Sequence, residues 1–273
     1  MLRLATVATL ALFLGAGKGV AHDFWISPEV YRWPAGGTMV ANLRVGERFI
    51  GFRHGFHPDR FDRFEILTSE GPITVDGGTG DIPALEAQDL PEGLAVIVHQ
   101  TAARELTWND WDSFAAFAAH KELGDVAAMQ DERGLDRAEV REDYIRYAKS
   151  LVAIGHGEGE DRQVGLRAEL VALANPYTDD LAGALPVQFW LDGEPRTMAR
   201  VEVFARSVDD GEASFSAYHT DSNGIVVLPV ERGMEYLVST VALEPVDGAE
   251  GEAEWRTLRA SLTFAVPEPE SGS

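Results

Sequence analysis

The stretch GTMVANLRVG, residues 37–46, decides the fold class of the first half of the chain. Its apolar residues stand at every second position: Met39, Ala41, Leu43 and Val45. A period of two residues is typical of a β-strand that buries one face. The segments 63–67, 71–77 and 94–102 are also short and β-rich, with Gly and Pro between them. Short strands at regular intervals predict an antiparallel β-sandwich.

The same rhythm of strands and turns returns after residue 165, in segments such as LPVQFWLDG, MARVEVFARS and TLRASLTFAV. It is typical of an immunoglobulin-like or transthyretin-like sandwich. The segment GHGEGEDRQVG, residues 155–165, is rich in Gly and charge and lacks periodicity, as linkers do. The sequence therefore predicts a mainly β protein with two β-sandwich domains, residues 22–164 and 165–267, and a disordered tail over 268–273.

A helical insertion is expected in the first domain, over residues 109–155. The segment DWDSFAAFAAHKEL, residues 110–123, follows a candidate N-cap, Asn109, and has acidic residues in its first turn. Its aromatic residues stand at three-residue spacing, on one face of a helix. A second helix is expected over 136–155, where the apolar residues of DRAEVREDYIRYAKSLVAIG form a stripe suited to packing.

The chain carries far more negative than positive charge. Its 23 Lys and Arg residues face 45 Asp and Glu residues, for a formal net charge of −22. Such a surface repels nucleic acid and anionic lipid, and it raises the local concentration of cations. The chain has no Cys, which excludes thiolate metal sites and thiol nucleophiles. Any metal must therefore be held by His, carboxylate, Met or backbone ligands.

Residues 1–21 have the pattern of a secretory signal peptide. Arg3 gives a positive start, and LATVATLALFLGAG, residues 4–17, is an apolar run of suitable length. Gly19 and Ala21 are the small residues that a signal peptidase prefers before its cleavage site. Spanning a bilayer takes about 20 apolar residues, and the run falls short of this. We therefore expect an exported, periplasmic protein whose mature chain does not insert into the membrane.

Cleavage after Ala21 makes His22 the first residue of the mature chain. An N-terminal His can chelate a metal through its α-amine and its imidazole Nδ1, which close a six-membered ring around the ion. With ordinary pKa values of about 7.7–8.0 and 6.5, both groups lose their protons near neutral pH at small cost. Nitrogen ligands of this kind suit Ni²⁺, Cu²⁺ and Zn²⁺. The alternative is that His22 is only a tolerated start.

Other histidines offer weaker signals. His99 ends the strand LAVIVHQ on its apolar face, which is more typical of a core or rim histidine. His120 lies near the edge of the expected helix, where a solvated histidine is the alternative. His54 and His57 form His-x-x-His in RHGFHPDRFDRF, but Pro58 favours a loop over a metal-binding helical turn.

No motif indicates catalysis. The segment TDSNG, residues 220–224, begins like a calcium loop, but Arg232 stands where the acidic ligand at the twelfth position belongs. An Asn-Gly hairpin turn fits the segment better. The chain has no Gly-rich phosphate loop, no G-x-S-x-G elbow and no H-E-x-x-H. These observations favour a binding protein over an enzyme.

Several segments, in this order, resemble one known family: AHDFWISPEVYRWPAGGTMVANLRVGERFIG, REDYIRYAKSLVAIG, ELVALANPY, TDSNGIVVLPV and ASLTFAVP. The resemblance is to exported proteins with an uncharacterised domain, labelled periplasmic components of cobalt/nickel transport. It implies nickel or cobalt handling beside a membrane importer rather than catalysis. It also implies a metal site of His22, His99 and His120. His57 of the His-x-x-His pattern is kept as a reserve ligand, apart from the resemblance.

The expectation is thus a periplasmic protein that binds a divalent transition metal, with Ni or Co favoured over Cu or Zn. Its partners would be the metal ion and the components of a membrane permease. Two alternatives from other classes stay open. One is a copper-binding oxidoreductase or copper carrier with an N-terminal histidine brace. The other is a structural or adhesion protein built of β-sandwiches that binds no metal.

Overall fold

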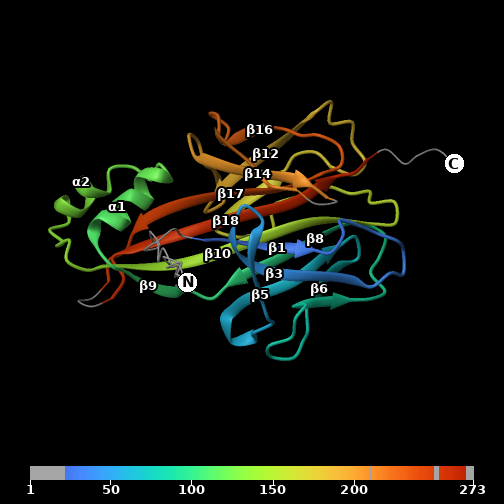
Figure 1. Ribbon diagram of the computed structural model, residues 1–273, viewed down its shortest axis with the longest axis horizontal. Helices are drawn as coiled ribbons and strands as arrows, with labels where there is room; N and C mark the ends of the chain where they lie inside the picture. Colours follow the sequence, from blue (N-terminus) through green and yellow to red (C-terminus); the bar gives the residue numbers. More distant parts are fainter. Residues whose placement is uncertain (1–21, 209–210, 249–251, 269–273) are drawn as a thin grey trace, which may run out of the picture.

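The computed structural model describes residues 22–208, 211–248 and 252–268. The predicted signal peptide and all but the first residue of the predicted tail lie outside the described residues. The fold is mainly β and consists of three sheets with two short helices at one end, which confirms the predicted class (Figure 1). None of the described helices has the length and apolar character needed to cross a bilayer.

The elements have the following bounds. The strands of the first half are β1 (Asp23–Pro28), β2 (Arg32–Trp33), β3 (Met39–Glu47), β4 (Ile50–His54), β5 (Phe61–Thr68), β6 (Gly71–Thr74), β7 (Leu85–Ala87), β8 (Gly93–Thr101), β9 (Arg104–Trp108) and β10 (Val140–Ile154). The helices are the 3₁₀ turn η1 (Pro58–Arg60), α1 (Trp111–His120) and α2 (Val126–Glu132). The remaining strands are β11 (Ala168–Ala172), β12 (Ala184–Leu191), β13 (Glu194–Pro195), β14 (Arg200–Ser207), β15 (Ser214–His219), β16 (Ile225–Pro229), β17 (Met234–Pro245) and β18 (Trp255–Val266).

One large sheet runs through the whole molecule. Its strand order is β15-β14-β17-β18-β10-β8-β5-β6, with β2 and β9 also paired to β10. The two halves of the chain meet where β10 and β18 pair in parallel, from Glu142 opposite Trp255 to Ser150 opposite Thr263. A small sheet of β1, β3, β4 and β7 packs against one part of it, and a sheet of β11, β12, β13 and β16 packs against another.

The central strands β8 and β10 contribute side chains to both cores. In β10, Tyr147 and Leu151 belong to the core under β11, β12 and β16, whereas Ala148 and Val152 belong to the core under β1 and β3. Strands buried on both faces have continuous apolar runs rather than alternating ones. The two predicted sandwiches therefore share the large sheet, and the boundary placed at 164–165 falls in the connection between β10 and β11.

The prediction of a helix over 136–155 is wrong, because most of these residues form the long strand β10. The spacing of apolar residues in this segment satisfies a helical period because both faces of the strand are apolar. Tyr and the β-branched residues Val and Ile favour a strand at such positions. Pairing with β18, β8 and β9 then supplies the backbone hydrogen bonds that the strand needs.

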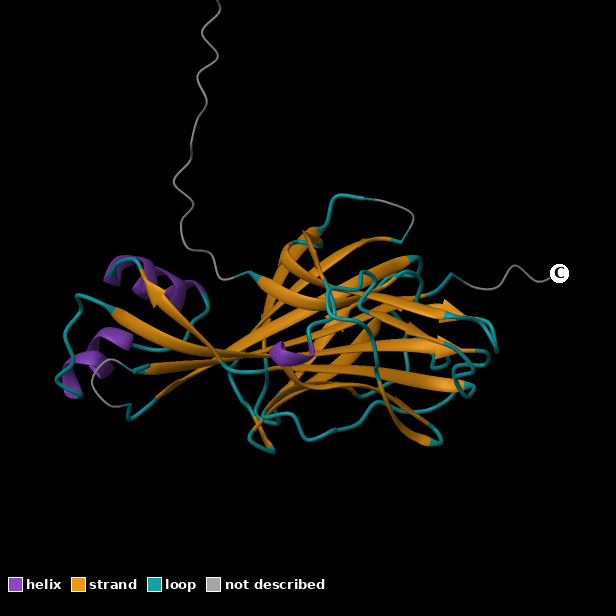
Figure 2. Cartoon of the chain, turned by 90° about the horizontal axis from the view of Figure 1, so that it is seen from below, coloured by secondary structure: helices purple, strands orange, loops and turns teal. Residues whose placement is uncertain are grey.

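The first expected helix is present as α1, with Asp110 rather than Asn109 as its N-cap. The Asp110 carboxylate accepts a hydrogen bond from the backbone N–H of Ser113. Phe114 and Phe117 pack against Trp108 in a separate small core. The two helices lie at one end of the molecule, beyond the body of the sandwich (Figure 2).

The turn expected at Asn223-Gly224 is present, but the prediction that it joins a hairpin is wrong. The Asp221 carboxylate accepts hydrogen bonds from the backbone N–H groups of Asn223 and Ile225. The flanking strands do not pair with each other: β15 pairs with β14 in the large sheet, and β16 pairs with β12 in a smaller one. The turn therefore carries the chain from one layer to the other.

Strand β1 is anchored firmly at the start of the described chain. It pairs with β3, from Asp23 opposite Gly46 to Pro28 opposite Ala41. The hydroxyl of Ser261 donates to the carbonyl oxygen of Phe24 at 2.7 Å, and the hydroxyl of Thr263 donates to that of Ile26 at 2.8 Å. These bonds across the layers fix the strand that directly follows His22.

Candidate functional site

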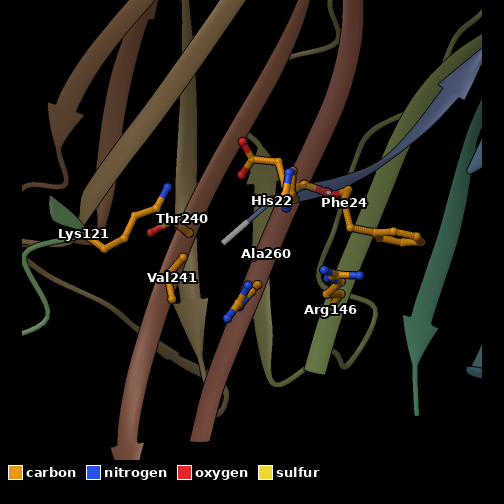
Figure 3. A pocket seen from close by; sticks show the side chains of 10 residues that line it. His22, Phe24, Lys121, Arg146, Thr240, Val241 and Ala260 are labelled. Carbon is orange, nitrogen blue, oxygen red and sulfur yellow. Dashed lines mark hydrogen bonds between the residues drawn. The ribbon is translucent and has the colours of Figure 1, made fainter. Parts of the chain in front are cut away.

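His22 lies at the edge of a small hollow, which we call the His22 pocket. The pocket is formed where the start of β1 crosses β10, β17 and β18, and its walls include Lys121, Arg146 and Arg259 (Figure 3). His22 itself is exposed. The hollow has a volume of about 10 Å³, which is about the space that one water-sized ligand needs. A space of this size suits a single ion.

Asp23 places a carboxylate beside His22. Burial raises the pKa of the Asp23 carboxyl, and the nearby charge of Lys121 opposes this shift. Glu202 adds to the rise, and the Ser239 hydroxyl and Arg259 oppose it. A cation that arrives beside this carboxyl would lower its pKa again, because the cation favours the charged form.

Glu202 of β14 lies within electrostatic range of Asp23 and is the centre of a group of charges. Its carboxylate contacts Lys121 Nζ at 2.6 Å, Arg200 Nε at 3.2 Å and His120 Nε2 at 3.3 Å. Burial raises the pKa of Glu202, but the charge and hydrogen bond of Lys121, the hydrogen bond of Arg200 and the charge of His120 outweigh it and hold the pKa below its ordinary value. Glu202 is therefore an ionised carboxylate already paired with cations.

Glu122, just after the end of α1, brings a second carboxylate into this region. Glu122 contacts Arg200 Nη1 at 2.8 Å and His219 Nε2 at 2.6 Å. These hydrogen bonds, that of His219 first, lower the pKa of Glu122. We call the six residues His120, Lys121, Glu122, Arg200, Glu202 and His219 the Glu202 network.

His99 has different surroundings. Its side chain is 3% exposed and is enclosed by the rings of Phe24, Phe61 and Phe64, with centroid distances of 5.0, 5.3 and 4.9 Å. Burial, helped slightly by the charge of His54, lowers the pKa of His99 to about 3. The ring is therefore neutral at neutral pH, and its Nδ1 has no hydrogen-bond partner among the described residues.

The structure does not bring the three predicted ligands together. His22 and His120 both border Lys121 or its partner Glu202, whereas His99 lies in the aromatic cluster. Within residues 22–208, 211–248 and 252–268, no three His, Asp or Glu side chains form a group that could hold a metal ion. The reserve ligand His57 lies in a further cavity that is also lined by His54 and His99.

The buried His99 makes the stability of the protein sensitive to acid. A histidine with a lowered pKa in the folded state contributes stability that is complete above pH 6.5 and is lost as the pH falls toward 3. Between pH 7 and 4.5, we expect this group to reduce the free energy of unfolding by about 2–3 kcal/mol. Urea denaturation at both pH values should show a smaller acid loss in His99→Leu than in the wild type.

The exposed His156 provides the matched control, as His156→Leu also removes one imidazole. An acid loss in His99→Leu equal to that of the wild type would show that His99 is protonated in the folded protein.

Two residues of this region are not evident from the sequence. Asp23 stands directly after His22, but an acidic residue next to a histidine is no sign of a site, because many acidic residues serve only solubility. Glu202 lies within MARVEVFARS, and its one available signal is a charged residue between the apolar Val201 and Val203. Only the fold places both of them near Lys121.

The comparisons with known proteins identify a family without assigning an activity. A search of curated proteins found no match. Among solved structures, the D0-D1 domain of intimin is 15% identical over 89% of this chain and 97% of that one, with a TM-score of 0.20. A DUF3823 family protein from Bacteroides uniformis is 10% identical over 90% of this chain and 100% of that one, with a TM-score of 0.21. Scores this low support no inference about structure or function.

The match to a protein family is extensive. Residues 20–244 match the domain of unknown function DUF4198, so the match begins beside His22 and ends within β17, before β18. The chain therefore belongs to the DUF4198 family.

Proposed function

We propose that this chain is an exported, periplasmic protein that binds a divalent transition-metal ion as cargo and serves as an accessory to a nickel- or cobalt-type membrane importer. In this proposal, the metal ligands are the α-amine and the imidazole of His22, freed by cleavage after Ala21. The protein carries the ion and catalyses no reaction. The observation on which the proposal rests is an exposed histidine before an anchored strand, beside a hollow of the size of one ion.

The size of the hollow favours an ion over a larger ligand. A space of about 10 Å³ suits one water-sized ligand, and two nitrogen ligands from one residue need no deep cavity. Nitrogen donors favour the later divalent metals, which include Ni²⁺, Co²⁺, Cu²⁺ and Zn²⁺. Nickel and cobalt are the preferred cargo in this proposal because of the resemblance described above.

Nearby carboxylates support the arrival of a cation. Asp23 adjoins His22, and Glu202 lies within electrostatic range of Asp23. A cation that approaches Glu202 must compete with Lys121, whose ammonium group is 2.6 Å from the carboxylate. This competition keeps binding exchangeable, as a carrier requires. The net charge of −22 would raise the rate at which cations meet the surface.

The experiment that tests the proposal is native mass spectrometry of the processed chain with Ni²⁺, Co²⁺, Cu²⁺ or Zn²⁺ added in turn. We expect the wild type to retain one ion per chain, and His22→Ala to retain none. His156→Ala, which removes an exposed histidine from a loop far along the chain, should bind as the wild type does.

Failure of the wild type to retain any of the four metals would contradict the proposal and favour a structural role. Retention of copper alone, with peroxide turnover once a reductant is added, would contradict the carrier role and favour a copper oxidoreductase.

A further inference from the structure

A second cavity shares two lining residues, Phe24 and Arg146, with the His22 pocket. Its volume is about 240 Å³. Pockets that enclose drug-sized ligands span about 300–1,000 Å³, so this one suits a smaller organic molecule. It is formed where η1 and the ends of β4, β8 and β9 meet β10. We call it the arginine cavity.

The arginine cavity is positively charged in a strongly acidic protein. Its walls carry three arginines, Arg60, Arg104 and Arg146, and three histidines, His54, His57 and His99. Among the described residues that line it, none is acidic. The chain as a whole has a net charge of −22, whereas the charged arginines of this wall are all positive. A positively charged wall concentrates anionic ligands.

The charges in the cavity act on one another. The pKa of His54 is lowered first by burial and then by Arg146, Arg60, His57 and Arg104. Burial, followed by the charges of Arg259 and Arg104, lowers the pKa of Arg146 to about 10. The cations are therefore close enough to repel one another, and an anion bound between them would relieve this repulsion.

The arginines remain available to a ligand. Across the described residues, no carboxylate forms an ion pair with Arg60, Arg104 or Arg146. The Arg146 guanidinium lies instead over the rings of Tyr144 and Phe24, 4.8 and 5.7 Å from their centroids. Figure 3 shows Arg146 beside Phe24.

Two buried nitrogen atoms at this cavity have no hydrogen-bond partner among the described residues: Nε of Arg146 and Nδ1 of His99. A buried polar atom left without a partner costs free energy, so such atoms call for a ligand or water. His99 is 3% exposed, and its ring is fixed by three phenylalanines. Its position is thus set before any ligand arrives.

The composition of the walls indicates the kind of anion. Phe24, Phe61 and Tyr144 provide apolar and aromatic surface, which inorganic phosphate does not use. The guanidinium group binds planar carboxylates through paired N–H donors. The geometry points to a binding site for a small organic carboxylate, whose anionic group is held by Arg60, Arg104 and Arg146 and whose compact apolar body packs on the aromatic walls.

The test is a calorimetric titration of the full mature chain with benzoate, benzamide and inorganic phosphate in parallel. Benzoate and benzamide have the same ring, but only benzoate is charged. We expect benzoate to bind at least about tenfold more tightly than benzamide, the size of effect that a charge-assisted hydrogen bond gives. The comparison of benzoate with benzamide uses only the wild-type chain, so it tests the proposal even if a variant is unstable.

The matched variants are the double substitution Arg60→Gln with Arg104→Gln and the control Arg53→Gln. All three arginines are exposed, and Arg53 lies on β4 beside His54 but does not line the cavity. Benzoate should bind at least about tenfold more weakly to the double variant, and as tightly to Arg53→Gln as to the wild type.

Three results would overturn the proposal: equal binding of benzoate and benzamide, equal binding of benzoate to the wild type and the double variant, or binding of phosphate without benzoate. The proposal does not use His22, which supplies the proposed metal ligands. A His22→Ala chain that has lost metal should therefore still bind benzoate.

Discussion

Replacing Lys149 by Met is expected to reduce the free energy of unfolding by about 3–5 kcal/mol, the cost of breaking a buried ion pair. The Lys149 ammonium lies between two carboxylates, 2.7 Å from Asp161 and 3.0 Å from Glu169. The three side chains are 1%, 0% and 1% exposed. Methionine has a similar length but no charge, so both carboxylates would lose their cation while they remain buried.

The effect is large because this group joins parts of the chain that are distant in sequence. Lys149 lies on β10, Asp161 in the connection that follows, and Glu169 on β11. The Glu169 carboxylate also accepts hydrogen bonds from the backbone N–H groups of Val164 and Leu166. Residues 155–165, which the sequence predicts to be a linker, are therefore held by contacts to β10 and to β11.

Urea denaturation at neutral pH measures the difference. The control is Arg137→Met, which breaks the exposed pair between Arg137 and Asp131, with side chains 40% and 68% exposed. Exposed pairs contribute about 0–1 kcal/mol, so this control should change stability little. A loss in Lys149→Met no larger than that of Arg137→Met would show that water reaches the two carboxylates.

The sequence predicts the strands that bury one face, because their period of two residues is visible locally. Residues 37–46 are the clearest case and become β3. The same reasoning fails for 136–155, where β10 is covered on both faces and its two apolar sets together imitate a helical stripe. No local pattern distinguishes such a strand from a helix.

The parallel pairing of β10 with β18 is also beyond local sequence patterns. Ser150 lies opposite Thr263, more than a hundred residues later, and the pairing follows from how all the layers pack. The sequence therefore suggests two separate sandwiches, whereas the structure runs one sheet through both.

The sequence predicts the candidate site only in part, because the packing of the layers brings most of its residues together. His22 stands out by its position after a signal-peptide pattern, which needs no knowledge of the fold. The apolar strand that carries His99 places its ring among three phenylalanines. Asp23 on β1 and Glu202 on β14 come near Lys121 only because the fold brings these strands to the segment that follows α1.

A single alanine added before His22 should weaken metal binding by about a hundredfold, at the upper end of the losses seen when support for a metal ligand is removed. The extension turns the α-amine of His22 into a peptide nitrogen, which cannot bind a metal in the same way without losing its proton. The imidazole, the folded body and the net charge stay the same. The change therefore isolates the amine from every other feature of the site.

The decisive measurement is a titration of the processed chain, beginning at His22, and of the alanine-extended chain with Ni²⁺ under identical conditions. The proposed two-nitrogen site predicts tight binding of one ion by the first chain and binding about a hundredfold weaker by the second. Equal affinity in the two chains would contradict it, because the amine would then take no part in holding the ion.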